Sequence, residues 1–301
     1  MTSTSNPLAL TLTIAQALTS AQTLGLDRLD AQLLLLHALG KSDTARAWLL
    51  AHDDDELDEP TASRFRAFSL RRAAGEPLAY IVGYKEFFGL RFEVDSRVLV
   101  PRPDTETLVQ WALDILQTSK YESPAVLDLG TGSGAVAVAI AHHTGAEVLA
   151  IDASAEALAV ASRNAAQLGC QVQFARSNWF DNVSGTFQVI VSNPPYVSSN
   201  DPHLAALRHE PLSALTAGVD GLDDVRRIID QAPAHLYANG WLLLEHGHDQ
   251  AIAVCALLRQ RGFANVQSRF DLAGIARCSG ASIGPGRICS RVGLGRSRGC
   301  D

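Results

Sequence analysis

The sequence lacks the cysteine patterns that hold small secreted domains together or bind zinc. Its five cysteines are odd in number, irregularly spaced and free of any C-x-x-C pair. A disulfide framework or a zinc site is therefore not expected. His246 and His248 form an H-x-H pair, but no third ligand stands at a motif spacing. We predict that the protein binds no metal.

The sequence also lacks an excess of positive charge and long apolar segments. Lys and Arg total 25 against 32 Asp and Glu, which gives a net charge of -7. Proteins that bind nucleic acid commonly present a basic face. No uncharged apolar run reaches membrane-spanning length, and the N-terminal MTSTSNPLAL has no signal-peptide pattern. We therefore expect a cytoplasmic monomer with no membrane partner and no direct nucleic-acid partner.

Hydrophobic residues make up 47% of the 301 residues, enough for two domains with cores of their own. Residues 1–74 are predicted to form a small helical bundle, with an apolar helix face at Leu33 to Leu36, Leu29 and Ala38. The acidic run DDDELDE is predicted to be a solvated loop and helix N-terminus.

Residues 75–103 change in composition and are rich in Gly, Pro, aromatic and β-branched residues. We interpret them as a connector that contains a β-hairpin at FFGLRFEV. Pro101 and Pro103 end the connector, and a helix is predicted from Asp104 to about Leu116.

Residues 104–280 alternate strands and helices, which predicts an α/β domain with a doubly wound, mostly parallel sheet. Helices are expected over AEALAVASRNAAQLG, from Asp223 to His235 and from Gln250 to Arg261. The expected strands are AVLDLG, EVLAID, QVQFA, FQVIVSN and GWLLLEHG. Ligands of such sheets bind beyond the carboxyl ends of the strands. Residues 281–301 are rich in Gly, Ser and Arg, do not continue as an apolar strand, and are predicted to be a disordered tail.

Two strand ends carry the pattern of a nucleoside-cofactor site. The first expected strand runs into Gly130-Thr131-Gly132-Ser133-Gly134, where glycines permit a tight turn and the following helix N-terminus favours negative groups. Asp152 ends the next strand, where a carboxylate can accept hydrogen bonds from ribose hydroxyls. The loop alone leaves adenosylmethionine and NAD open as cofactors.

A third strand end, Asn193-Pro194-Pro195-Tyr196, favours methyl transfer. The nitrogen of a planar NH₂ group is a weak nucleophile because its lone pair is delocalised. The Asn193 side-chain oxygen and the Pro194 carbonyl can accept its two N–H groups and direct the lone pair, while Tyr196 stacks on the flat group. Glu245 ends a further strand on the same side, where shaping the cofactor site and capping a loop are equally open roles.

At these residues the chain resembles the PrmC/HemK family of protein-(glutamine-N5) methyltransferases, which act on peptide chain release factors. The resemblance extends from the N-terminal helices to about Gly280. It is carried by GEPLAYIVGYKEFFGLRFEV, VLVPRPDTETLV, VLDLGTGSGAVAVAIA, SNWF, VSNPPYV, EPLSAL and LLLEHG in this order.

The resemblance implies a Rossmann-like class I methyltransferase domain, S-adenosyl-L-methionine as cofactor, and the glutamine of the release factor GGQ motif as substrate. It implies a helical N-terminal domain that recognises the substrate. It places Asn193, Pro194 and Tyr196 in catalysis. The implied cofactor residues are Gly130, Thr131, Gly132, Ser133, Gly134, Asp152, Trp179 and Asn193. The implied substrate residues are Asn193, Pro194, Pro195 and Tyr196.

The chain departs from the family at two places. Asn178 stands where the family usually has an acid, and the tail from Ala281 does not match the family's final strand. A nucleic-acid amino methyltransferase is the main alternative, since NPPY is shared with such enzymes. An NAD-dependent oxidoreductase and a degenerate binding protein are the others.

Overall fold

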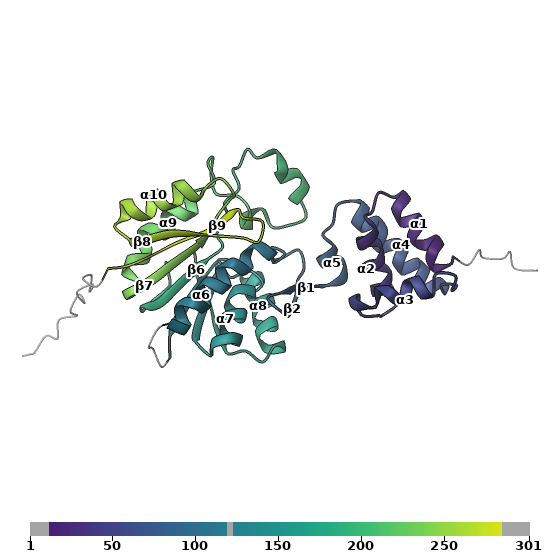
Figure 1. Ribbon diagram of the computed structural model, residues 1–301, viewed down its shortest axis with the longest axis horizontal. Coiled ribbons are helices and arrows are strands. Elements are labelled where there is room, and N and C mark those ends of the chain that lie inside the picture. The colour runs from purple at the N-terminus through teal and green to yellow at the C-terminus, as the bar shows by residue number, and fades with distance from the viewer. Residues whose placement is uncertain (1–11, 119–122, 285–301) are drawn as a thin grey trace, which may run out of the picture. The chain divides into compact units, whose positions relative to one another are not determined.

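A computed structural model describes residues 12–118 and 123–284 of the chain and divides it into two compact units (Figure 1). The first unit holds the described residues through Tyr84, with Val94–Ser96 and Ala205–His209. The second holds Lys85–Glu93, Arg97–Leu204 and the described residues from Glu210 onward. Each unit is considered by itself below.

The first unit is a helical bundle, as the sequence predicts. Its helices are α1 (Ile14–Thr23), α2 (Arg28–Ala38), α3 (Arg46–Ala51), α4 (Glu59–Ala73) and α5 (Leu78–Val82). Leu34, Leu35 and Leu36 of α2 are fully buried in its core. The prediction that Leu29 belongs to the same apolar face is wrong, because its side chain is 48% exposed. It lies in the first turn of α2, beside the exposed Arg28.

The acidic run before α4 is a solvated loop and helix N-terminus, as predicted. Every residue of Asp53–Glu59 is exposed except Leu57, which joins the core of the bundle. The Asp58 carboxylate accepts a hydrogen bond of 2.7 Å from the amide of Thr61 and caps α4. The run therefore stabilises a helix end.

The predicted hairpin is formed by β1 (Tyr84–Phe87) and β2 (Leu90–Glu93). Both turn residues, Phe88 and Gly89, have positive φ, of 51° and 76°. Such a conformation is unfavourable for Phe, but the Phe88 amide donates to the Glu106 carboxylate at 3.0 Å, which holds the turn.

The second unit is built on a seven-stranded sheet of order β5-β4-β3-β6-β7-β9-β8. Its first five strands are parallel and β9 is antiparallel to both neighbours, so the predicted doubly wound, mostly parallel sheet is confirmed. The strands are β3 (Ala125–Leu129), β4 (Glu147–Asp152), β5 (Val172–Arg176), β6 (Phe187–Ser192), β7 (Leu236–Glu245), β8 (Ala264–Phe270) and β9 (Ala276–Ser282).

Helices cover both faces of this sheet (Figure 1). One buried cluster joins α6 and α7 to strand side chains such as Val126 and Val189, and the other joins α9 and α10 to Leu127 and Ile190. Successive residues of β3 and β6 thus enter opposite layers, as the two-residue period of a strand requires. The helices are α6 (Glu106–Thr118), α7 (Ala135–Thr144), α8 (Ala155–Gln167), α9 (Asp223–Gln231) and α10 (Ala251–Arg261).

Short 3₁₀ turns connect or extend these elements. The helix predicted from Asp104 begins as such a turn, Pro103–Thr105, and continues as α6. The other turns are Asp43–Ala45, Pro202–Leu207, Leu212–Ala214 and Ala232–Ala234.

The sequence analysis did not predict β8 and β9. Its prediction of a disordered tail from Ala281 is wrong for the first residues of that segment, which belong to β9. Ala281 and Ser282 end β9, where they pair with Leu242 and Trp241 of β7, and Ile283 is 4% exposed. Small residues suit this strand because a Cβ at Gly280 would lie 2.6 Å from Leu243. Residues 285–301 lie outside the described part of the chain.

We expect a chain ended after Gly280 to be less stable than one ended after Gly284. The shorter chain loses the buried Ile283, whose amide donates to the Gly240 carbonyl and whose carbonyl accepts from the Asn239 amide. It also loses Ala281 and Ser282, which pair with Leu242 and Trp241 of β7. This removes roughly 3 kcal/mol or more of stability, or about 6–12 °C in melting temperature. Calorimetry of both chains measures the difference. Equal melting temperatures would show that the end of β9 contributes nothing to the fold.

Candidate functional site

Four strand ends form one row at the carboxyl edge of the parallel sheet. Leu129 of β3 is paired with Ile151 of β4 and with Ser192 of β6, and Ser192 is paired with Leu244 of β7. The next residue of each strand therefore belongs to the same row. These residues are Gly130, Asp152, Asn193 and Glu245. The register brings three predicted site residues together and adds Glu245.

The glycine loop follows β3 in a conformation that glycine favours. Gly130, Gly132 and Gly134 have φ of 72°, 55° and 81°. The amides of Gly130 and Thr131 both donate to the Ile151 carbonyl, at 2.9 and 2.8 Å. A Cβ at Gly134 would lie 3.0 Å from the Cβ of Ala161, so glycine also lets α8 pack closely. The loop is fixed to the neighbouring strand and helix before any ligand binds.

A buried acid that we did not predict lies beneath this loop. Asp128 is 2% exposed and accepts a hydrogen bond of 2.6 Å from the Thr131 hydroxyl. Burial raises the pKa of its carboxyl to about 7, although the Thr131 bond opposes this shift. An acid inside the apolar strand AVLDLG was the sequence signal that could have revealed it.

The Asp152 carboxylate is held by the backbone around it. Its two oxygens accept hydrogen bonds from the amides of Gly132 and Ser154, at 2.9 and 2.8 Å. A carboxylate offers about four acceptor positions, so two remain for vicinal hydroxyls. The geometry therefore fits the predicted nucleoside site: two fixed acceptors beside a glycine loop at a helix N-terminus.

Trp179 borders the same loop. A Cβ added at Gly130 would lie 3.4 Å from the Trp179 ring, and the indole Nε1 donates to Asp224 at 2.9 Å. Trp179 has a φ of 53°, and its carbonyl accepts a 2.7 Å bond from Ser177. The side-chain oxygen of the neighbouring Asn178 accepts from Arg227 in the orientation that satisfies both groups. Trp179 is thus an anchored flat surface beside the loop.

Asn193 presents its amide in a defined direction. Its Nδ2 donates to the Thr105 hydroxyl at 3.2 Å, which we did not predict. Within residues 12–118 and 123–284, no hydrogen bond reaches Oδ1 of Asn193 or the carbonyl oxygen of the buried Pro194. These are the two acceptors that the sequence analysis assigned to a planar NH₂ group. Pro195 and Tyr196 follow them, each partly buried.

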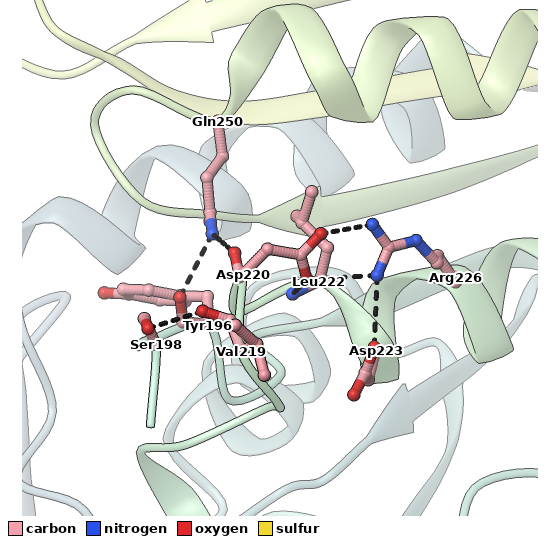
Figure 2. A network of polar contacts seen from close by, with 8 residues as sticks. All are labelled: Tyr196, Ser198, Val219, Asp220, Leu222, Asp223, Arg226 and Gln250. Carbon is pink, nitrogen blue, oxygen red and sulfur yellow. Dashed lines mark hydrogen bonds and ion pairs between the residues drawn. The ribbon is translucent and has the colours of Figure 1, made fainter. Parts of the chain in front are cut away.

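The loop before α9 and the start of α10 support the backbone of this motif (Figure 2). The Gln250 side chain donates to the carbonyls of Tyr196 and Asp220, at 3.1 and 3.2 Å. Asp220 pairs in turn with Arg226 of α9. Gly221 has a φ of 72°, and a Cβ there would lie 2.1 Å from the Tyr196 carbonyl oxygen. This contact, which the sequence analysis missed, leaves no room for a side chain at Gly221.

Glu245 lies at the end of β7 and is only 1% exposed. Burial raises the pKa of its carboxyl to about 7, and Asp104 adds to the shift, whereas hydrogen bonding from Thr105 and Tyr196 and the charge of Arg277 oppose it. Its Oε1 lies 3.5 Å from the Tyr196 hydroxyl, and its buried Oε2 accepts no hydrogen bond from the described residues. Burial, followed by the charge of Glu245, raises the pKa of the Tyr196 hydroxyl. Glu245 thus lies beside a side chain of the Asn193–Tyr196 motif, and no loop amide donates to its carboxylate within the described residues.

Glu245→Gln is expected to make stability less dependent on pH. The folded pKa is raised, so the folded state holds this proton more tightly than the unfolded state. The associated stability is complete below the unfolded pKa and is lost as pH rises through about 7. The parent chain should lose roughly 2–3 kcal/mol of stability between pH 5 and 8 through the ionisation of Glu245, and the variant should not show this loss. The separate loss caused by the ionisation of Asp128 should remain in both proteins. Urea unfolding at both pH values measures this.

The matched control is Glu147→Gln, at the exposed amino end of β4. This control should leave the pH dependence of stability as it is in the parent chain. An unchanged dependence in Glu245→Gln would mean that Glu245 ionises as it would in water.

His246 belongs to the H-x-H pair for which the sequence analysis predicted no metal. It is buried, with Nδ1 donating to the Gly247 carbonyl at 2.9 Å and Nε2 accepting from the Ser279 hydroxyl at 2.8 Å. Both ring nitrogens thus have protein partners. In the described part of the chain, no group of three or more His, Cys, Asp or Glu residues is placed to hold a metal ion, and no helix is long and apolar enough to cross a membrane.

Comparison with protein families finds matches in both units. Residues 11–83 match the PrmC N-terminal domain, and residues 107–210 match the methyltransferase small domain. The release factor glutamine methyltransferase of Burkholderia pseudomallei is 49% identical over 269 residues, covering 86% of this chain and 93% of that protein. The one of Bordetella pertussis is 49% identical over 264 residues, covering 86% and 96%.

Solved structures share the fold at low identity. The human Mettl16 catalytic domain, solved with a MAT2A hairpin, aligns with a TM-score of 0.54 and 18% identity over 75% of this chain and 81% of that chain. A methyltransferase from Pyrococcus furiosus aligns with a TM-score of 0.51 and 20% identity over 74% and 99%. These likenesses support a class I methyltransferase fold.

Proposed function

Because this chain belongs to the release factor glutamine methyltransferase family, we propose that it methylates the glutamine of the GGQ motif in peptide chain release factors. The methyl group comes from S-adenosyl-L-methionine and is added to the side-chain amide nitrogen. The observation that carries this proposal is the Asn193–Pro194 pair: two acceptors without protein partners in the described chain, in one row with Asp152 and the glycine loop.

The cofactor is held by residues of the strand ends. Asp152 accepts the ribose hydroxyls with the lone pairs that Gly132 and Ser154 leave open. Trp179 lies against the adenine, and the Gly130 to Gly134 loop supplies close backbone approach. When bound, the cofactor supplies a methyl group that its sulfonium charge already activates, so the chain needs to provide position and orientation.

The glutamine amide is oriented by Asn193 Oδ1 and the Pro194 carbonyl. Each accepts one N–H, which turns the nitrogen lone pair out of conjugation and toward the methyl carbon. The new C–N bond would form as the S–C bond of the cofactor breaks and leaves its electrons on sulfur, and one N–H proton would then be released. Pro195 and Tyr196 border the planar amide, and Tyr196 stacks on it.

The helices of the first unit are proposed to recognise the release factor, since they match the PrmC N-terminal domain. A cytoplasmic location and a monomeric state belong to the same proposal. The alternative, methylation of nucleic-acid bases, is less favoured because the chain carries a net charge of -7. An oxidoreductase would leave the Asn193–Tyr196 motif without a purpose.

The test is mass spectrometry of a recombinant, unmethylated release factor after incubation with this protein and S-adenosylmethionine. We expect a gain of one methyl group on the GGQ peptide, and none when that glutamine is replaced by alanine. Duplex DNA and ribosomal RNA serve as competing substrates. Methylation of a nucleic acid with none on the release factor would overturn the proposal.

A further inference from the structure

We propose that Gln250 is a positioning residue, whose side chain fixes the peptide that follows Tyr196 and thereby holds the Asn193–Tyr196 motif in the direction that methyl transfer needs. Gln250 is the N-cap residue of α10 and lies outside the row of strand ends. The inference rests on the proposed function, because it takes this motif as the place where the substrate amide is oriented. It assigns a task to a residue that does not itself touch the reacting atoms.

The direction of the Gln250 amide is decided by backbone groups. Its Oε1 accepts a hydrogen bond of 2.8 Å from the Gly247 amide. Its Nε2 donates to the carbonyls of Tyr196 and Asp220, at 3.1 and 3.2 Å (Figure 2). A backbone N–H can only donate and a carbonyl can only accept, so all three bonds require the same orientation. The reversed amide would lose all of them.

The oxygen end of this amide is tied to the sheet. The main-chain amide of Gln250 donates to the Gly247 carbonyl at 3.0 Å, so the side chain and the backbone of Gln250 bind the same buried residue. The preceding His246 follows β7 directly, and its amide donates to the Arg277 carbonyl of β9 at 2.9 Å. Gln250 therefore connects the motif to a rigid part of the second unit.

The motif itself is a short segment held at both ends. At one end, Ser192 closes β6 and is paired with a neighbouring strand on each side. At the other end, the peptide between Tyr196 and Val197 is bound at both of its polar atoms. Gln250 donates to its carbonyl, and its amide donates to the Leu215 carbonyl at 2.8 Å.

Between these two anchors lie only Asn193, Pro194 and Pro195. Each proline fixes its own φ and restricts the backbone of the residue before it. A displacement of the Tyr196 carbonyl must therefore be absorbed by the few torsions that remain. Those torsions also aim the Pro194 carbonyl and the Tyr196 ring, which the proposed function places on the substrate amide.

The opposite side of the Tyr196 carbonyl is closed by the turn before α9. Gly221 has a φ of 72°, and a Cβ there would lie 2.1 Å from the Tyr196 carbonyl oxygen and 2.9 Å from Nε2 of Gln250. Next to it, the Ser198 hydroxyl donates to the Val219 carbonyl at 2.6 Å (Figure 2). The turn leaves room for the carbonyl and its donor, and for little else.

Gln250→Glu tests the anchor with almost no change in size. The new carboxylate can still accept from Gly247, but it places an oxygen against two carbonyl oxygens. We expect kcat to fall about tenfold to a hundredfold, since a displacement on the order of 1 Å can cost this much. The KM for S-adenosylmethionine should stay within about threefold, because the glycine loop and Asp152 are held by other partners.

Gln260→Glu is the matched control, because it makes the same chemical change at an exposed position of α10. It should turn over as the parent chain does. Gln250→Met is the second variant, which removes the donor without adding a charge and should lower kcat by a similar factor. A kcat within about threefold of the parent in a folded Gln250→Met would overturn the inference. So would a loss explained by a raised KM for S-adenosylmethionine with kcat unchanged.

A readout without turnover keeps the inference distinct from the proposed function. Tyr196-Val197 is the only Tyr-Val pair in the sequence, so carbonyl-¹³C tyrosine with ¹⁵N valine gives one NMR cross-peak for this peptide. Loss of the hydrogen bond in Gln250→Met should move the Tyr196 carbonyl carbon to lower chemical shift, whereas Gln260→Glu should leave it in place. An unmoved resonance in Gln250→Met would show that the bond is absent, and the inference fails. If it moves as expected while the parent chain methylates no release factor, the proposed function fails and the anchoring of Tyr196 stands.

Discussion

Asn193→Ala is expected to lower kcat for release factor methylation on the order of 10²-fold or more. The substitution removes Oδ1, one of the two acceptors that we propose orient the substrate amide, and leaves β6, Pro194 and Pro195 in place. Loss of one preorganised polar contact to a developing transition state typically costs this much. Docking of the release factor should change little, because it rests on a wider surface. Single-turnover methylation, measured beside a direct binding assay, reports the two effects separately.

Asn193→Asp serves as the companion variant. It keeps an oxygen toward the substrate but places a negative charge beside the sulfonium and removes the Nδ2 donor to Thr105. We expect it to remain well below the parent in kcat, even where it binds substrate more tightly. Turnover near that of the parent chain in Asn193→Ala would rule out the mechanism. Weak binding with a normal chemical step would make Asn193 a recognition residue.

Asp152→Ala is expected to weaken S-adenosylmethionine binding about tenfold to a hundredfold. We propose that the carboxylate accepts charge-assisted hydrogen bonds from ribose hydroxyls, and losing one such bond costs roughly 1.5–3 kcal/mol. The substitution also removes the partners of the Gly132 and Ser154 amides, at 2.9 and 2.8 Å, so the glycine loop keeps its two bonds to the Ile151 carbonyl but loses the one that holds Gly132. Both effects act in the same direction. Titration calorimetry with the cofactor measures the change.

Glu147→Ala is the matched control for this variant. Glu147 begins the same strand, β4, at the opposite edge of the sheet, and its side chain is exposed. It should bind the cofactor as the parent does. Circular dichroism confirms that both variants are folded. Unchanged affinity in a folded Asp152→Ala would remove Asp152 from the cofactor site.

Local patterns were sufficient for the parts of the site that lie on one segment. The glycine loop, Asp152 and the Asn193–Tyr196 motif each directly follow or end an apolar strand, and the strand-helix alternation places such ends at one edge. The parallel sheet, the hairpin at β1 and β2 and the helical bundle were predicted for the same reason. Each depends on the period of apolar residues, on glycine and on proline, which act over a few neighbouring positions.

The last strand was missed because its residues carry no local signal. The sequence ARCSGAS of β9 consists mostly of small residues with little preference for a strand. This segment forms a strand because it pairs with β7 on one side and with β8 on the other. Glycine suits position 280 because Leu243 and Trp111 leave no room for a side chain there. Packing against distant elements decided its conformation, and composition alone suggested disorder.

The sequence by itself determined which side chains stand at the strand ends, and therefore the class of chemistry. Only the tertiary structure decided how they are oriented. Asn193 and Thr105 are 88 positions apart, and Tyr196 and Glu245 are 49 apart. Which group donates in each hydrogen bond depends on which partners meet in the fold, since hydroxyls and side-chain amides can serve as either donors or acceptors. Burial of Glu245 at the end of β7 is likewise a property of the assembled unit, and it raises the pKa of the carboxyl to about 7, which no local pattern contains.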